Sequence, residues 1–89
     1  MTAPSARLQR RIRRDFGDHA DDVVAQLGLL PETSQDPERI QAAVVLRADG
    51  DHDAFLSELD LVRLDWRDTL MDTGLEHADW HERLDVLLG

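Results

Sequence analysis

Four interruptions divide this chain into segments whose apolar residues recur three or four positions apart. The interruptions are Gly17, the stretch from Pro31 to Pro37, Gly50 and Gly74. A spacing of three or four places side chains on one face of an α-helix, whereas a half-buried β-strand needs strict alternation, which no segment shows. The sequence therefore predicts an all-α fold with short loops between neighbouring helices.

Capping residues indicate where the predicted helices begin. Asp18, Asp36, Asp51 and Asp79 stand at N-cap positions, where a carboxylate accepts hydrogen bonds from the first turn. Glycine in the left-handed conformation is the usual residue after a helix end, and Pro31 ends the second helix. A polar loop is expected at residues 32–35. The predicted helices span about 4–16, 18–30, 36–48, 51–73 and 79–88.

Each predicted helix carries its own apolar stripe. The third helix combines its stripe with Val45 and Leu46, so we expect it to be the most buried. After Gly74, Leu75 is placed to pack back on Leu70, as in a Schellman C-cap. The stripes consist of Leu8, Ile12 and Phe16; Ala20, Val23, Val24, Leu27 and Leu30; Ile40, Ala43, Val44 and Ala48; Phe55, Leu56, Leu59 and Val62; and Trp80, Leu84, Leu87 and Leu88.

The chain's only two tryptophans follow aspartates in a doubled segment, Asp65-Trp66 and Asp79-Trp80. An aspartate followed by an acid three positions later is typical of a helix start. The second copy follows the stop at Gly74, so we interpret it as a helix start. The first copy is in phase with the preceding apolar stripe, which leaves two alternatives, a helix of about 22 residues or a break near Asp65. We expect both tryptophans to be buried, because the core has few other large side chains.

Length and composition indicate one globular domain spanning residues 1–89. The chain has 89 residues, of which 42% are hydrophobic, and a chain of this size forms a single thin core. Because the helices are short and uneven, we predict a small irregular bundle of five or six helices. The chain has no cysteine, which excludes disulfides and thiolate metal sites.

No motif predicts catalysis, a cofactor or a metal. The run Asp49-Gly50-Asp51-His52-Asp53 partly matches a calcium loop, but Ala54 stands where the sharp turn requires glycine. His77 and His81 are four apart, as in zinc helices, but the expected cap at Asp79 places His77 before its helix. We therefore interpret these residues as helix ends and solvated side chains, and predict no catalytic, cofactor-binding or metal-binding residue.

Nothing in the sequence predicts membrane insertion. The longest apolar run is Ala42 to Leu46, whereas a membrane span needs roughly 20 residues. The basic beginning of the chain is not followed by the apolar stretch of a signal peptide. The expected location is the cytoplasm.

The most unusual feature is a cluster of arginines opposite the first apolar stripe. Five arginines precede the first acid, Asp15, and the rest of the chain carries five arginines against nineteen acids, a net charge of −14. We take Arg7, Arg10, Arg11 and Arg14 as the candidate interaction surface. Three alternatives remain open, which are pairing within the molecule, binding to an acidic protein, and binding to nucleic acid or anionic lipid.

These features predict a small acidic, non-enzymatic interaction or regulatory module. Its partner is an unknown protein or a second copy. The first alternative is a nucleic-acid-directed regulator, acting through the basic helix or through an acidic body that mimics DNA, and the second is a small enzyme. The net charge of −9 disfavours direct contact with a polyanion.

Three segments also carry a family resemblance, the arginine-rich "RRIRRDFG", the helix start "QDPERIQAAVV" and "DWRDTLMDTGL". With these segments the chain resembles a family of short, all-helical bacterial proteins from GC-rich genomes. The resemblance covers most of the chain. That family has no known function, so the resemblance implies a helical fold but assigns no site residue.

Overall fold

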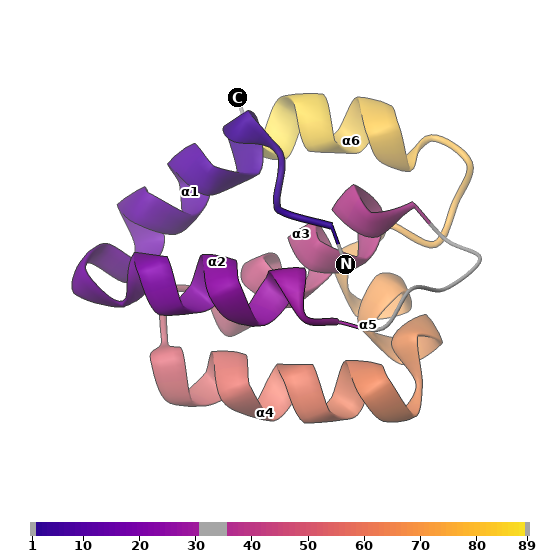
Figure 1. Ribbon diagram of the computed structural model, residues 1–89. Coiled ribbons are helices and arrows are strands. Elements are labelled where there is room, and N and C mark those ends of the chain that lie inside the picture. Colours follow the sequence, from indigo (N-terminus) through magenta and orange to yellow (C-terminus); the bar gives the residue numbers. More distant parts are fainter. Residues whose placement is uncertain (1, 31–35, 89) are drawn as a thin grey trace.

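The fold is all-α, a small irregular bundle, as predicted (Figure 1). A computed structural model describes residues 2–30 and 36–88. Within these ranges there is no strand, and the helices agree with the predicted five or six. The predicted stop at Pro31 and the polar loop at 32–35 lie outside the described residues. The elements are α1 (Ala6–Phe16), the short 3-10 turn η1 (Gly17–His19), α2 (Ala20–Gly28), α3 (Pro37–Ala48), α4 (His52–Leu64), α5 (Trp66–Thr73) and α6 (Trp80–Leu87).

Of the four predicted aspartate caps, two are confirmed with their hydrogen bonds, Asp79 is confirmed in position only, and Asp18 is wrong. Asp36 accepts a hydrogen bond from the Glu38 amide at 2.9 Å, and Asp51 accepts one from Ala54 at 3.1 Å. Asp18 caps nothing, because the chain continues from α1 into η1 and α2 begins at Ala20. Asp79 precedes α6, but its side chain makes no capping bond. Its carboxylate lies 3.4 Å from Arg83 instead.

The long segment between Asp51 and Thr73 is broken at Asp65. This residue is extended, with φ −153° and ψ 98°, and its carboxylate accepts from the Arg67 amide at 3.0 Å. The chain therefore turns between α4 and α5 although the apolar phase continues across the break. At the other end of α5 the predicted Schellman cap is confirmed, since the Leu75 amide donates to the Leu70 carbonyl at 2.9 Å.

Helix α3 is the centre of the bundle, and α6 and α4 lie on opposite sides of it (Figure 1). Every residue from Ile40 to Val45 is buried, which confirms that the third helix is the most buried. Phe16 and Phe55 meet edge to face with ring centroids 5.7 Å apart, joining α1 to α4. The predicted core positions Leu56 and Leu87 are wrong, because their side chains are 41% and 40% exposed.

Two arginines join α3 to the helices packed around it. Arg7 of α1 contacts Glu38 of α3 and Asp85 of α6. Arg47 of α3 lies between Asp72 of α5 and the buried Glu58 of α4, with 3.2 Å between its Nε and the Glu58 Oε1. Each arginine therefore holds three helices together through two carboxylates.

Candidate interaction surface

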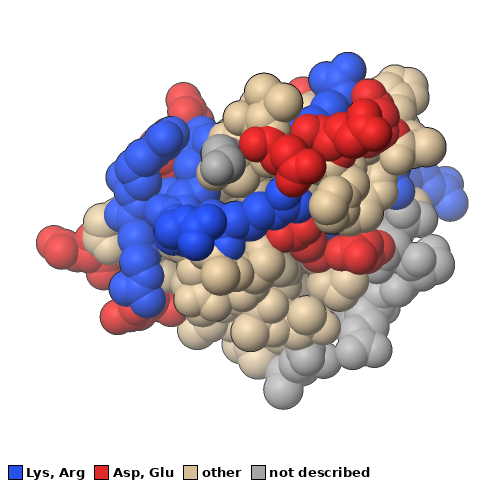
Figure 2. All heavy atoms as spheres, turned by 90° about the horizontal axis from the view of Figure 1, so that it is seen from above, with Lys and Arg blue, Asp and Glu red and all other residues tan. Residues whose placement is uncertain are grey.

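The arginines of α1 point away from the core because the opposite face of the helix packs into it. Leu8 and Ile12 are fully buried and Phe16 nearly so, which orients the helix about its axis. The arginines occupy the remaining arc. Seen from above, they form a continuous basic area beside an acidic one (Figure 2).

The Arg7 side chain is held by contacts within the molecule. Its Nε and Nη2 donate to the two oxygens of Glu38 at 2.9 and 2.7 Å, a bidentate pair, and its Nη1 contacts Asp85. The Arg7 side chain is only 20% exposed. Hydrogen bonds from Arg7 and from the Ser5 hydroxyl hold the pKa of the Glu38 carboxyl below its ordinary value, although partial burial opposes the shift. Glu38 in turn raises the pKa of Arg7.

Arg11 is also held inside the molecule. Its Nε donates to Asp15 at 2.7 Å and its Nη1 donates to the Leu87 carbonyl at the end of α6 at 2.8 Å. The side chain is 17% exposed. Arg7 and Arg11, the inner arginine row, therefore fasten α1 to α3 and α6.

Three other arginines face solvent. Arg10 and Arg13 are exposed, and among the residues that the structure describes no carboxylate lies within ion-pairing distance of either. Arg14 is 72% exposed and reaches Asp15 only at 3.4 Å, where Arg11 already binds. These three residues form the outer arginine row. Of the four predicted surface residues, Arg10 and Arg14 therefore face solvent, whereas Arg7 and Arg11 make contacts within the molecule.

Arg13 lies outside the predicted set of four, although it belongs to the exposed row. Its position on the solvent arc follows from the same helical spacing, so the signal was present in the sequence. The division of the arginines into an inner and an outer row does not follow from helical spacing. It depends on where α6 lies, and Arg7 and Asp85 are 78 positions apart in the chain.

Helix α6, which lies against the inner arginine row, carries exposed apolar side chains. The contacts of Arg7 with Asp85 and of Arg11 with the Leu87 carbonyl bring the end of α6 alongside α1. Val86 is 83% exposed on this helix and Leu87 is 40% exposed. The exposed arginines and these exposed apolar side chains therefore lie on two helices that contact each other.

No family model, curated protein or solved structure matches the chain. The interpretation of this surface therefore rests on its own geometry, and the resemblance to a bacterial family stays a prediction. No helix within residues 2–30 and 36–88 has the length and apolar character to cross a membrane.

The two motifs that partly match calcium and zinc sites lie at helix ends. Asp49 takes a left-handed conformation after α3 with φ 50°, and Asp51 caps α4. His77 lies before α6 and 2.9 Å from Glu76, whereas His81 lies on α6 against Trp80. Within the described ranges, no three histidine or carboxylate side chains come together as metal ligands.

A pair of stacked histidines lies where α2 and α4 begin. The rings of His19 and His52 are 4.2 Å apart and nearly parallel, and His52 Nε2 is 2.8 Å from an Asp22 oxygen. This contact lowers the pKa of Asp22. The cluster joins η1 and α2 to α4 through side chains at the surface.

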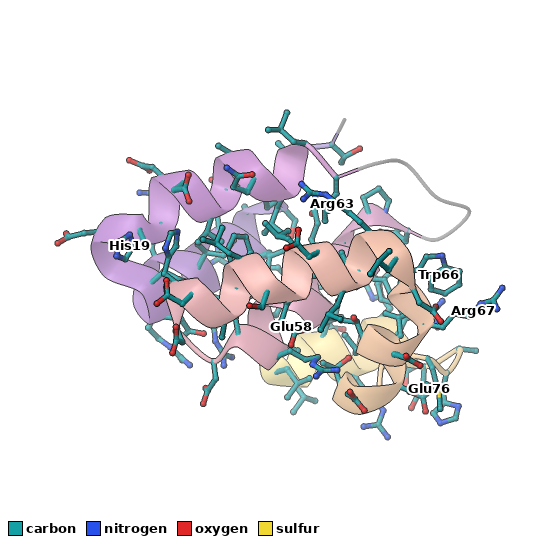
Figure 3. The ribbon with its side chains drawn as sticks, turned by 90° about the horizontal axis from the view of Figure 1, so that it is seen from below. His19, Glu58, Arg63, Trp66, Arg67 and Glu76 are labelled. Atoms are coloured by element: carbon teal, nitrogen blue, oxygen red, sulfur yellow. The ribbon has the colours of Figure 1, made fainter. Side chains whose placement is uncertain are left out.

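The two tryptophans are half-buried rather than buried, which corrects the sequence prediction. Each packs against the core and lies near an arginine. The Arg67 guanidinium is 5.5 Å from the Trp66 ring centre, and both side chains project at the end of α4 (Figure 3). The Arg39 guanidinium is 5.8 Å from the Trp80 ring. Each indole ring thus has a guanidinium within cation–π distance.

Proposed function

We propose that this protein is a small non-enzymatic interaction module that contacts an acidic protein surface through the outer arginine row. The observation that carries the proposal is the absence of a close carboxylate partner for Arg10 and Arg13 in the described parts of the chain. The body of the molecule is acidic, yet no carboxylate of the described residues neutralises these two cations. Guanidinium groups bind carboxylates with directed hydrogen bonds, and arginine is enriched where interfaces are strongest.

Nucleic acid is a poorer ligand for this surface. Three arginines within about one helical turn neutralise about three phosphates. The logarithm of the binding constant then falls against the logarithm of the salt concentration with a slope of about −2.7, so binding is weak at physiological ionic strength. The acids in the rest of the chain repel a long polyanion beyond the reach of the row. A folded acidic protein offers carboxylates over a short distance, which matches the size of the row.

The test is affinity capture from a lysate of the organism that encodes the protein, with the native chain and Arg10→Glu/Arg14→Glu as baits. We expect the variant to lose partners whose contact surface is acidic, at least tenfold by recovered amount, because four charge units change at the contact. The matched control is Arg63→Glu/Arg83→Glu, which changes the net charge equally at exposed positions on α4 and α6.

Retention of every partner by Arg10→Glu/Arg14→Glu would refute the proposed contact surface. Equal losses with the Arg63→Glu/Arg83→Glu control would refute it as well, because the effect would then follow net charge. Capture of nucleic acid instead of protein, sensitive to Arg10→Glu/Arg14→Glu, would support the nucleic-acid alternative.

A further inference from the structure

An apolar groove with an acidic rim lies at the turn between α4 and α5, and neither the bundle nor the arginine surface uses it. It has a volume of about 420 Å³. Exposed apolar side chains line it, namely Leu64 at 84%, Met71 at 62% and Leu61 at 49% exposure. Single exposed apolar side chains are ordinary, but three around one groove are typical of a contact surface.

The rim of the groove carries negative charge. Asp65, Asp68 and Asp72 line it, together with Arg47. Arg47 is already held by Asp72 and Glu58. Among the described residues no arginine lies within ion-pairing distance of Asp65 or Asp68. A segment that fills this groove must therefore present apolar side chains flanked by cations.

The molecule itself carries a surface of that description. The outer arginine row is exposed on α1, and α6, which the inner row fastens to α1, exposes Val86 and Leu87. Arg10 and Arg14 are one helical turn apart, about 6 Å along α1, and Asp65, the N-cap of α5, is separated from Asp68 by about 4–5 Å along the helix axis. Two helices that cross can therefore bring the two charged rows into register.

The two surfaces are on opposite sides of the bundle. Helices α1 and α6 occupy the upper side in Figure 1, and α4 runs along the lower side with α5 at its end. Figure 2 views the arginine surface from above, and Figure 3 views α4 and α5 from below. One molecule therefore cannot satisfy its own groove, and two molecules that pair through these surfaces leave one surface of each kind free.

We propose that the α4–α5 groove binds the α1–α6 arginine surface of a second copy, so that the protein associates head to tail. The inference rests on the proposed function, because it uses the outer arginine row as the contact and names the acidic partner as another copy of this chain. The molecule measures only 33 × 28 × 22 Å, so each contact is small. We expect weak association, with a dissociation constant of roughly 0.01–1 mM.

The test uses the full chain in sedimentation equilibrium from about 0.02 to 1 mM, the range that brackets the expected dissociation constant. Arg10→Glu/Arg14→Glu blocks the arginine surface, and Leu64→Ser/Met71→Ser blocks the groove without adding charge. The substituted side chains are exposed, so both variants should fold, which circular dichroism checks. Leu29→Ser/Leu56→Ser removes two exposed apolar side chains elsewhere and serves as the matched control.

We expect the native chain and the control to form a concentration-dependent series of oligomers. Each blocked variant alone should associate at least tenfold more weakly. An equimolar mixture of the two blocked variants should form a dimer that grows no further, because the mixture contains one intact surface of each kind. That mixture should match the native dissociation constant within about threefold.

Four results would overturn the inference: a native chain that is monomeric at the highest concentration, a blocked variant that associates like the native chain, a control that loses association, or a mixture that stays monomeric. A monomeric native chain whose captured partner still depends on Arg10 and Arg14 would remove only the head-to-tail contact. A monomeric native chain with capture insensitive to those residues would remove the proposed function as well.

Discussion

Replacing Arg7 by methionine is expected to lower the free energy of unfolding by about 2 kcal/mol, whereas Arg10→Met should change it by about 0.5 kcal/mol or less. The two arginines lie on the same helix, one turn apart, and methionine preserves the apolar stem of each. Within residues 2–30 and 36–88, carboxylates pair with Arg7 but not with Arg10. Its loss leaves the carboxylate of Glu38, whose side chain is 17% exposed, with the Ser5 hydroxyl but no cation. The expected loss of stability is smaller than for a fully buried ion pair because the Asp85 side chain is 60% exposed and water screens its charge.

Urea denaturation at neutral pH measures both changes against the native chain. A second substitution tests the cause. Arg7→Met/Glu38→Gln should be more stable than Arg7→Met alone, because it removes the carboxylate that the first change leaves without a cation. Equal effects of Arg7→Met and Arg10→Met would contradict the division of α1 into an inner and an outer row.

Gly50→Ala is expected to destabilise the fold by about 3 kcal/mol, the largest effect predicted for a single methyl group. Gly50 has φ +80°, a conformation that side chains with a Cβ rarely adopt. A Cβ at this position would lie 2.9 Å from the Asp15 carbonyl oxygen, and that oxygen belongs to backbone that cannot swing away. The turn between α3 and α4 would have to move off the end of α1, where Phe16 contacts Phe55.

Gly17→Ala provides the control for that prediction. Gly17 also has a positive φ, of +54°, but nothing lies within 4 Å of a Cβ placed there. It should cost only the conformational strain, about 2 kcal/mol, because the ψ of −115° at Gly17 also lies outside the left-handed helical region. Thermal unfolding separates the two variants, since each kcal/mol shifts the Tm of a domain of this size by roughly 4–8 °C. Similar Tm values for both alanine variants would show that the close approach to Asp15 does not matter.

The helices and most of their ends could be predicted because their signals are local. The spacing of Leu8, Ile12 and Phe16 gives the buried face of α1, and the Asp36-Pro37 pair gives the start of α3. These signals depend on residues within one or two turns. The all-α fold follows from them because no segment offers a competing alternation.

The doubled Asp-Trp segment shows where local signals are insufficient. The sequence leaves Asp65 ambiguous, yet its side chain caps α5, whereas the side chain of Asp79, a plain helix-start signal, accepts no hydrogen bond from the backbone of α6. Asp65 caps because the turn between α4 and α5 leaves it extended, while Asp79 has φ −84° and ψ 10° and an alternative partner in Arg83. The aspartates of the two Asp-Trp pairs therefore make different hydrogen bonds, because the chain takes a different tertiary path at each.

The candidate surface was predictable as a helix face but not as a set of free cations. Helical spacing puts five arginines on one arc, and it treats Arg7 and Arg10 alike. What separates them is Glu38 and Asp85, which come from helices distant in the sequence. The exposed groove at Leu64 and Met71 has the same origin, because the break at Asp65 sets how α4 and α5 cross.

The most direct test of the divided arginine row is a nitrogen–proton correlation spectrum of the arginine Nε–H groups in the native chain near pH 6. Nε–H groups bound to carboxylates exchange slowly with water and resonate away from the free position. Arg7 and Arg11 should each give a protected, shifted signal, because their Nε–H groups donate to Glu38 and Asp15. Arg10 and Arg13 should exchange rapidly at the free position. Equal protection for Arg7 and Arg10 would contradict the account.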